Sequence, residues 1–401
     1  VEISNATTPD SMFSVASSKL IIKRVHFINV TSENPLMFVS FGSVATINDA
    51  LFESSTMQLL LVLSASLSAN NMTIQNIGSK HPVIEFISGY NSSILNSVVT
   101  NCTSEESVLY ATGSQFDLLQ NLTISNIKPG VMDLHSSSIT RMNSVVIRNA
   151  QKGLFLDKSE VALISNSTFY NLGSSSILKG GAIYSKSSSI NVRNSTFYLN
   201  KAVDGGAVFI DCKTTDTCSN LIMDVAFTEN VAVSSGGAIK YNVFRPKLTN
   251  VVFTLNKAEY GNNIASYPTK IVQAGSITNK VTINNVGSGI DFKSNLVFEL
   301  QDYDSQRMVL DDTSQIKISP VTSSAKVTGI DSAKVVNGTA VFSSLVWMYK
   351  PGATNVLFEA TSKSINTAIV RTALGSVSNN TISVSFRHCK PGEFKVDAYT
   401  C

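Results

Sequence analysis

The sequence predicts an all-β protein, a right-handed parallel β-helix of about ten coils followed by a β-sandwich. Three observations lead to this prediction. A motif with a glycine pair and a phenylalanine recurs about every 25 residues, apolar residues alternate around it with a period of two, and only 15% of the 401 residues are charged. Ordinary globular proteins carry about 25% charged residues, and stacked strands that present Ser, Thr and Asn to solvent explain the deficit.

The repeat is clearest in GGAIYSKSSSINVRNSTFYLNKAVDGGAVFIDC at 180–212. Alignment on the phenylalanine of NSTFYLN gives ten copies with a mean spacing of about 25 residues. The residue two positions before each anchor is apolar or small, which is typical of a strand with one buried face. A turn and a second apolar run follow, so each coil holds two or three short strands. The anchors are Phe27, Phe52, Ile74, Val99, Ile124, Ile147, Phe169, Phe197, Phe227 and Phe253.

Asparagines recur two or three residues after the anchors. Asn tolerates the left-handed conformation of turns, and its amide can hydrogen-bond to the same group in the next coil. The pattern therefore predicts an asparagine ladder at one turn. Its members are Asn76, Asn126, Asn149, Asn171, Asn200, Asn230 and Asn256, with Asn29 and Asn101 at the same positions of their coils.

The alternation of GGA(I/V) with FxxN resembles the repeat of the polymorphic outer-membrane proteins and of related β-helix surface proteins in protists. The motif is clear over residues 165–265, for example at Phe197 with Asn200 and at Phe227 with Asn230. This resemblance implies a secreted, surface-exposed β-helix used in adhesion or as structural material, with no catalytic residues to carry over. The segment NGTAVFSSL and the later NVLFEAT resemble immunoglobulin-like modules of adhesins, and the C-x-P-G-E opening at Cys389 resembles small cysteine-rich repeats.

Five segments follow from these patterns. Seven short alternating runs, from LVFELQD to TISVSF and including TAIVRTA, predict the sandwich. The segments are an extended N-terminal stretch at 1–20, the β-helix at 21–268, a connector that caps it at 269–290, an immunoglobulin-like sandwich at 291–387, and the start of a cysteine-rich module at 388–401.

N-glycosylation is the clearest chemical signal. Four of the ten N-x-S/T sequons lie three residues before an anchor, where odd parity places the side chain outside, so they predict one column of glycans on the β-helix. Those four are Asn71, Asn121, Asn166 and Asn194; Asn5, Asn91, Asn337 and Asn379 are further candidates, and Asn29 and Asn101 are less favoured because they fall in the ladder.

Cysteine spacing predicts disulfides rather than a metal site. Cys212 and Cys218 enclose a five-residue insertion and favour a local disulfide in an oxidising compartment. Cys389 and Cys401 pair with each other or with cysteines beyond the segment. Cys102 is left as a buried free thiol or an intermolecular bridge. The four histidines lie elsewhere in the sequence, so no metal and no cofactor is expected.

Charge and hydropathy exclude some partners. The net charge is +3 without any basic run, which argues against nucleic acid, and the longest apolar run, around 57–63, is too short for a membrane-spanning helix. Glu85 and Asp133 are the candidate residues for carbohydrate chemistry, because they occupy equivalent positions two coils or about 10 Å apart with Tyr110 between them. Without a base or cation nearby, solvated carboxylates are the favoured interpretation. A candidate aromatic face for stacking on sugar consists of Tyr90, Tyr110, Tyr184, Tyr198 and Phe209, some of which are expected in the core. A candidate weak cation site consists of Asp204, Asp211, Asp216 and Asp224, for which solvation in loops is the favoured interpretation.

These features together predict a secreted or cell-surface glycoprotein with a structural or adhesive role, a subunit of a surface layer, appendage or fibril. It is expected not to be an enzyme. Its expected partners are further copies of itself, N-linked glycans and other surface proteins or polysaccharide. The alternative is a carbohydrate-binding or polysaccharide-degrading β-helix protein.

Overall fold

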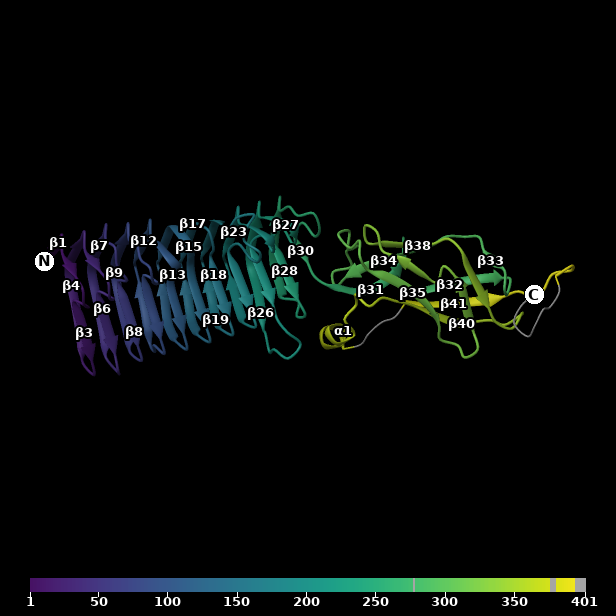
Figure 1. Ribbon diagram of the computed structural model, residues 1–401, viewed down its shortest axis with the longest axis horizontal. Helices are drawn as coiled ribbons and strands as arrows, with labels where there is room; N and C mark the ends of the chain where they lie inside the picture. Colours follow the sequence, from purple (N-terminus) through teal and green to yellow (C-terminus); the bar gives the residue numbers. More distant parts are fainter. Residues whose placement is uncertain (277, 376–379, 394–401) are drawn as a thin grey trace. The chain divides into compact units, whose positions relative to one another are not determined.

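The computed structural model describes residues 1–276, 278–375 and 380–393. They form two units, Val1–Ala265 and Ser266–Cys401, of which the first is a stack of parallel coils and the second a set of mixed sheets (Figure 1). Each unit is described by itself.

A coil of the first unit consists of two or more strands, and residues in the left-handed conformation mark its corners. One coil contains β10 (Ile84–Ile87), β11 (Ser92–Leu95) and β12 (Val98–Thr100). The φ angles of Ser88, Asn96 and Asn101, which lie at its corners, are +54°, +48° and +53°. Asn tolerates this conformation because its short polar side chain bonds locally. The repeated polar residues of the sequence therefore bend the chain from one face to the next.

The predicted fold class is confirmed. All ten anchors pair in register, starting with Phe27 of β4 (Lys19–Ile28) opposite Phe52 of β7 (Val44–Glu53). Nine of the ten anchors are buried, and the rings of Phe169, Phe197 and Phe227 stack at centroid distances of 4.7 and 4.8 Å. Such ring pairs contribute about 0.5–1.5 kcal/mol each beyond the burial of apolar area. The interior of the coils is thus a column of apolar side chains.

The strands form three ladders, two of which are joined into one bent sheet by long strands such as β4 and β7 and together make up one face. The face that carries the anchors, the anchor face, comprises β1 (Glu2–Ser4), β4, β7, β9 (Ser66–Gln75), β11, β12, β14 (Gln115–Gln120), the first part of β15 (Thr123–His135), β16 (Ser138–Asn143), β17 (Val146–Ala150), β19 (Glu160–Ser165), β20 (Thr168–Leu172), β22 (Ser189–Arg193), β23 (Thr196–Tyr198), β26 (Asn220–Thr228) and β29 (Lys247–Thr254). The second face comprises β3 (Phe13–Ala16), β6 (Met37–Ser40), β8 (Leu60–Leu63), β10, the end of β13 (Thr103–Thr112), the end of β15, β18 (Leu154–Asp157), β21 (Ile183–Lys186), β25 (Val208–Asp211), β28 (Ile239–Asn242) and β30 (Ile264–Ala265). Short corner pairs are β2 (Thr7–Thr8) with β5 (Thr31–Ser32) and β24 (Lys201–Asp204) with β27 (Val231–Ser235).

Residues 1–20 are not the extended segment that was expected. Strand β1 pairs in parallel with β4, with Ile3 opposite Phe27, and β3 pairs with β6. These residues form a coil of their own, ahead of the first coil recognised in the sequence. The repeat was missed here because Ile3 is the only apolar side chain on β1 and no phenylalanine occupies its anchor position.

The asparagines that were predicted to form one ladder form two. The first is exposed: Asn126 Nδ2 donates to Asn101 Oδ1 at 2.9 Å, and Asn101 Nδ2 donates to Asn76 Oδ1 at 3.1 Å, with Asn149 and Asn171 continuing the series. The second is fully internal and consists of Asn200, Asn230 and Asn256. The three-residue offset from the anchor, in place of two, turns these side chains inward. Whether an asparagine lies two or three residues after the anchor therefore decides whether it joins the exposed ladder or the buried one.

The second unit packs three sheets around a core that includes Trp347, Phe298, Phe342 and Phe358. One sheet has the order β31 (Pro268–Gln273), β34 (Leu296–Asp302), β38 (Thr339–Phe342). A second has the order β32 (Lys280–Val286), β41 (Asn380–Phe386), β40 (Val356–Thr361), β35 (Gln315–Pro320), β37 (Ser332–Lys334). The third has the order β33 (Asp291–Phe292), β39 (Leu345–Met348), β36 (Lys326–Gly329).

Two predictions for this unit are wrong. The expected connector at 269–290 supplies β31 and β32, whose Ile271 and Val281 are buried in the sandwich core. The run TAIVRTA, expected as a strand, lies in helix α1 (Thr367–Leu374). Asn366 caps that helix by accepting from the backbone of Ala368 and Ile369, and Gly375 ends it in the left-handed conformation, so the capping residues outweigh the β-branched content.

Candidate functional site

The outward side chains of the second face form two columns. Because strand side chains alternate, every second residue of these strands points away from the interior, and the parallel register aligns the same position from coil to coil. The first column reads Glu85, Tyr110, Asp133, Phe155, Tyr184, Phe209, Lys240, and the second, two residues further along each strand, includes His135, Asp157, Lys186, Asp211 and Asn242.

Four rings in these columns form a continuous surface, which we call the aromatic ribbon: Tyr110, His135, Phe155 and Tyr184. Their successive centroid distances are 5.3, 5.5 and 5.2 Å. All four are partly exposed, whereas the next ring, Phe209, is only 2% exposed. Three coil spacings make the ribbon about 14 Å long, long enough for several sugar residues.

A loop at 173–180 stands beside the ribbon and encloses a cleft of about 580 Å³. The cleft is lined by Asp133, Phe155 and Tyr184 from the strands and by Leu178 and Lys179 from the loop, among others. The Leu178 side chain is 73% exposed. An apolar loop residue and two rings thus border a space that also contains a carboxyl group.

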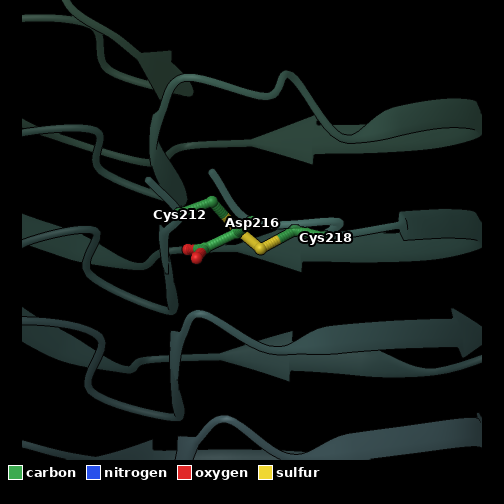
Figure 2. A group of neighbouring side chains, drawn as sticks. All are labelled: Cys212, Asp216 and Cys218. Atoms are coloured by element: carbon green, nitrogen blue, oxygen red, sulfur yellow. A yellow bond between two sulfur atoms is a disulfide. The ribbon is translucent and has the colours of Figure 1, made fainter. Parts of the chain in front are cut away.

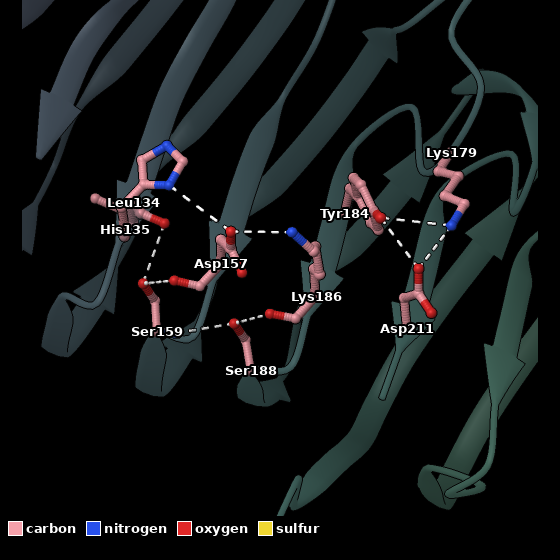
Figure 3. A network of polar contacts seen from close by, with 9 residues as sticks. All are labelled: Leu134, His135, Asp157, Ser159, Lys179, Tyr184, Lys186, Ser188 and Asp211. Atoms are coloured by element: carbon pink, nitrogen blue, oxygen red, sulfur yellow. Dashed lines mark hydrogen bonds and ion pairs between the residues drawn. The ribbon is translucent and has the colours of Figure 1, made fainter. Parts of the chain in front are cut away.

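Lys179 fastens this loop to the face. Its Nζ lies 2.6 Å from Asp211 Oδ2, and the Tyr184 hydroxyl donates to the same oxygen at 3.1 Å (Figure 3). The ammonium also lies 4.7 Å from the centroid of Phe209, which it covers. Although burial opposes the effect, these partners hold the pKa of Asp211 below its usual value. Lys179 therefore connects the loop to the second face through its contacts with Asp211 and Phe209.

Two further lysines near the ribbon are also paired with carboxylates. Lys186 Nζ lies 3.1 Å from Asp157 Oδ2, whose other neighbour is His135 at 4.0 Å (Figure 3). Lys240 Nζ lies 2.9 Å from Asp204 Oδ1. In each of these three pairs the lysine and the carboxylate neutralise one another. Such a surface suits a ligand that offers hydroxyl groups rather than charges.

Asp133 is not the solvated carboxylate that was expected. Burial raises its pKa, although a hydrogen bond with Ser107 and the charges of Lys152 and His135 oppose that rise. Glu85, two coils away, accepts a 2.7 Å hydrogen bond from Gln58 Nε2. The interpretation as a solvated carboxylate assumed that no base or cation lies near Asp133. Lys152 and His135 do lie near it, because a loop and the second column bring them to the same face.

The aromatic face expected from the sequence is only partly assembled. The structure brings Tyr110 and Tyr184 together, but Tyr198 stacks on Tyr170 on the anchor face at 5.4 Å. His135 and Phe155, which complete the ribbon, were missed. Phe155 lies in GLFLD at the position equivalent to Glu85, so alignment of the second strand in every coil would have found it.

The four expected acidic residues do not form one cation site. Asp204 and Asp211 pair with lysines, as above, and Asp224 accepts from Asn250 at 2.6 Å. Asp216 accepts from the backbone N–H of Lys213 within the disulfide loop.

The cysteines include a local disulfide between Cys212 and Cys218 (Figure 2). Asp216 lies beside it, with its ligand atom within 4.8 Å of both sulfurs, but the two sulfurs are bonded to each other and so offer no thiolates to a metal. Cys102 is a buried free thiol whose pKa is raised by burial to about 11. Cys389 is disulfide-bonded, and its expected partner Cys401 lies outside the described residues.

The four column sequons, Asn71, Asn121, Asn166 and Asn194, are all exposed left-handed residues at one corner of the anchor face. Asn91 and Asn337 are likewise exposed. Asn5 is exposed as well and accepts from Asn29 Nδ2 at 3.2 Å. Asn379 lies outside the described residues.

A family model described as a right-handed β-helix region matches residues 38–197. The chain is a parallel β-helix protein. No curated protein sequence matches it. Among the described residues, no helix combines the length and the apolar content needed to cross a bilayer.

Solved structures similar to this β-helix protein include carbohydrate-active proteins. The catalytic domain of a GH87 alpha-1,3-glucanase in complex with nigerose is 11% identical, with a TM-score of 0.28; the match covers 66% of this chain and 63% of the glucanase domain, less than two thirds of its length. A tailspike protein of E. coli bacteriophage HK620 in complex with a hexasaccharide is 8% identical, with a TM-score of 0.23 and coverages of 90% and 85%. At these values the likeness concerns the fold alone.

The expectation that the chain is not an enzyme is corrected by this comparison. The structures to which the chain is similar include catalytic domains.

Proposed function

We propose that this β-helix protein binds a polysaccharide along the aromatic ribbon. The observation that carries the proposal is the row of partly exposed rings from Tyr110 to Tyr184 beside the cleft. Aromatic side chains offer an apolar face to the C–H surface of a sugar ring, and the neighbouring polar groups are placed to bond its hydroxyls. Four rings in a line fit a chain of sugars better than a single sugar.

The charge pairs indicate which polysaccharide is bound. Lys179, Lys186 and Lys240 each lie within 3.1 Å of a carboxylate on the protein, so binding an anionic sugar there would require breaking an existing pair. A neutral polysaccharide avoids that cost. We therefore expect neutral glucans or mannans to bind more tightly than polygalacturonate or alginate.

The test is titration calorimetry of the full chain with a panel of soluble neutral glucans and mannans, and with polygalacturonate and alginate for comparison. Phe155→Ala and Tyr184→Ala are each expected to weaken binding of a neutral chain at least tenfold, because each removes one ring of the ribbon. Tyr170→Ala removes a stacked ring on the anchor face and is the matched control, which should bind like wild type. Absence of binding across the panel, or an equal loss in the control, would contradict the proposal.

An adhesive role at a cell surface, in a protein that is secreted and glycosylated, is part of the same proposal. It is supported by the Cys212–Cys218 disulfide, which suits an oxidising compartment, and by the exposed sequon column on a different face from the ribbon. Glycans on that column would leave the ribbon accessible. Self-association into a layer or fibril remains a proposal that light scattering of the purified chain tests directly.

Glycopeptide mass spectrometry of the protein from its natural source is expected to find Asn121 and Asn166 more fully occupied than Asn101. Asn101 both donates to Asn76 and accepts from Asn126 within the ladder. Asn121 donates to Asn96 at 2.8 Å and Asn166 donates to Asn143 at 2.9 Å, so a glycan at either residue disturbs one such contact between coils where Asn101 has two. Higher occupancy at Asn101 than at Asn121 would contradict this ranking.

A further inference from the structure

The first outward column places two carboxyl groups on either side of one ring of the ribbon. Glu85, Tyr110 and Asp133 are direct partners in three successive coils. Two coil spacings separate the backbones of Glu85 and Asp133 by about 10 Å. Both carboxyl groups also raise the pKa of the Tyr110 hydroxyl, after the larger effect of burial and that of Glu106, which shows that both lie within electrostatic reach of it.

A sugar stacked on Tyr110 would therefore lie between two carboxyl groups. Glycosidases that invert configuration hold an acid and a base about 6.5–9.5 Å apart, which leaves room for a water molecule on one side of the sugar. Carboxyl groups carried by backbones about 10 Å apart reach this separation when their side chains lean toward the ring between them. The stacking ring between them distinguishes this arrangement from a mere group of acidic residues.

The surroundings of the two carboxyl groups differ in the way that acid and base roles require. Asp133 lines the cleft and is partly desolvated, which favours its protonated form. Glu85 accepts from the amide of Gln58, a side chain that is only 7% exposed and therefore fixed in place. A donor of this kind holds the carboxylate in one orientation with its other oxygen available.

We propose that Glu85 and Asp133 hydrolyse a glycosidic bond of the bound neutral polysaccharide, with inversion at the anomeric carbon. Asp133 gives its proton to the glycosidic oxygen as the bond from that oxygen to the anomeric carbon breaks. Glu85 removes a proton from the water whose oxygen bonds to the same carbon from the opposite side. One water is consumed, two shorter chains are released, and exchange with solvent returns the proton from Glu85 and restores that of Asp133. This inference rests on the proposed function, because the substrate must first bind the ribbon.

The experiment measures hydrolysis and binding separately on the full chain. Every glycan of the neutral panel that binds by calorimetry is incubated with the protein, and products are followed by chromatography and by proton NMR of the new anomeric centre. Wild type is expected to release shorter chains whose first product has inverted configuration. Asp133→Asn and Glu85→Gln are each expected to lower turnover at least 100-fold while the dissociation constant changes less than about threefold.

The matched control is Asp117→Asn, which removes an exposed carboxylate from β14, in the coil of Tyr110 but on the anchor face. It should hydrolyse like wild type. The rate should also fall at high pH in wild type, as Asp133 loses its proton.

The possible failures are distinguishable. Binding without hydrolysis of any bound glycan would overturn this inference and leave the proposed function in place. Hydrolysis that survives Glu85→Gln and Asp133→Asn would overturn the assignment of these two residues. Absence of binding throughout the panel would remove both the proposed function and the inference.

Discussion

Replacing Asn230 with alanine is expected to lower the free energy of unfolding by about 3–5 kcal/mol, since each buried polar group left without a partner costs about 1–3 kcal/mol. Asn230 Oδ1 accepts from the backbone N–H of Asn200 and from Asn200 Nδ2 at 3.0 and 2.9 Å, and Asn230 Nδ2 donates to Phe197 O at 3.0 Å. All of these groups lie inside the stack, and Asn200 Nδ2 keeps a second bond, to Phe169 O at 3.0 Å.

Chemical denaturation followed by circular dichroism measures this effect, with Asn126→Ala as the control. Asn126 makes the same kind of amide contacts in the exposed ladder, where water replaces them, so a loss of about 1 kcal/mol or less is expected. Similar losses for the two variants would show that burial does not distinguish the two ladders.

Replacing Gly206 with alanine is expected to be as damaging, because the added methyl group meets backbone rather than a movable side chain. Its Cβ would lie 2.6 Å from the carbonyl oxygen of Val231 and closer still to that of Gly237 in the next coil. Relieving such a clash costs at least about 1–3 kcal/mol in a packed interior, and here it also pushes two coils apart. We expect a loss of about 3 kcal/mol or more, measured by thermal and chemical denaturation.

Gly78→Ala is the matched control for this variant. Its nearest neighbour is Thr103 Oγ1 at 3.7 Å, an ordinary contact, so stability should stay within about 0.5 kcal/mol of wild type or rise. If Gly206→Ala were equally harmless, the close approach of coils at the glycine pairs would not be a requirement of the fold.

The coils were predictable because one physical constraint repeats. Each coil must bury an apolar side chain at the same place, so Phe27, Phe169 and Phe227 mark the register directly in the sequence. Where only one apolar residue marks a strand, as Ile3 does in β1, the repeat cannot be recognised from the sequence. In the sandwich, β31 and β32 were missed because their alternation is short and follows the last coil without a clear turn signal.

The candidate site was less predictable, because it depends on which side chains share a face. Tyr110 and Tyr184 were identified, but Phe155 and His135 join them only when the second strand of each coil is placed in register. The contact of Lys179 with Asp211 bridges 32 positions and a loop, and no sequence pattern indicates it. The desolvation of Asp133 likewise arises from groups that are distant in sequence.

The central claim is that the aromatic ribbon is the surface that holds a polysaccharide. A crystal structure of the protein with the oligosaccharide that binds most tightly in calorimetry tests it most directly. The account predicts consecutive sugar rings stacked on Tyr110, Phe155 and Tyr184, with one of them between Glu85 and Asp133. Sugar bound on the Tyr170 and Tyr198 pair, or anywhere else with the ribbon left open to solvent, would contradict it.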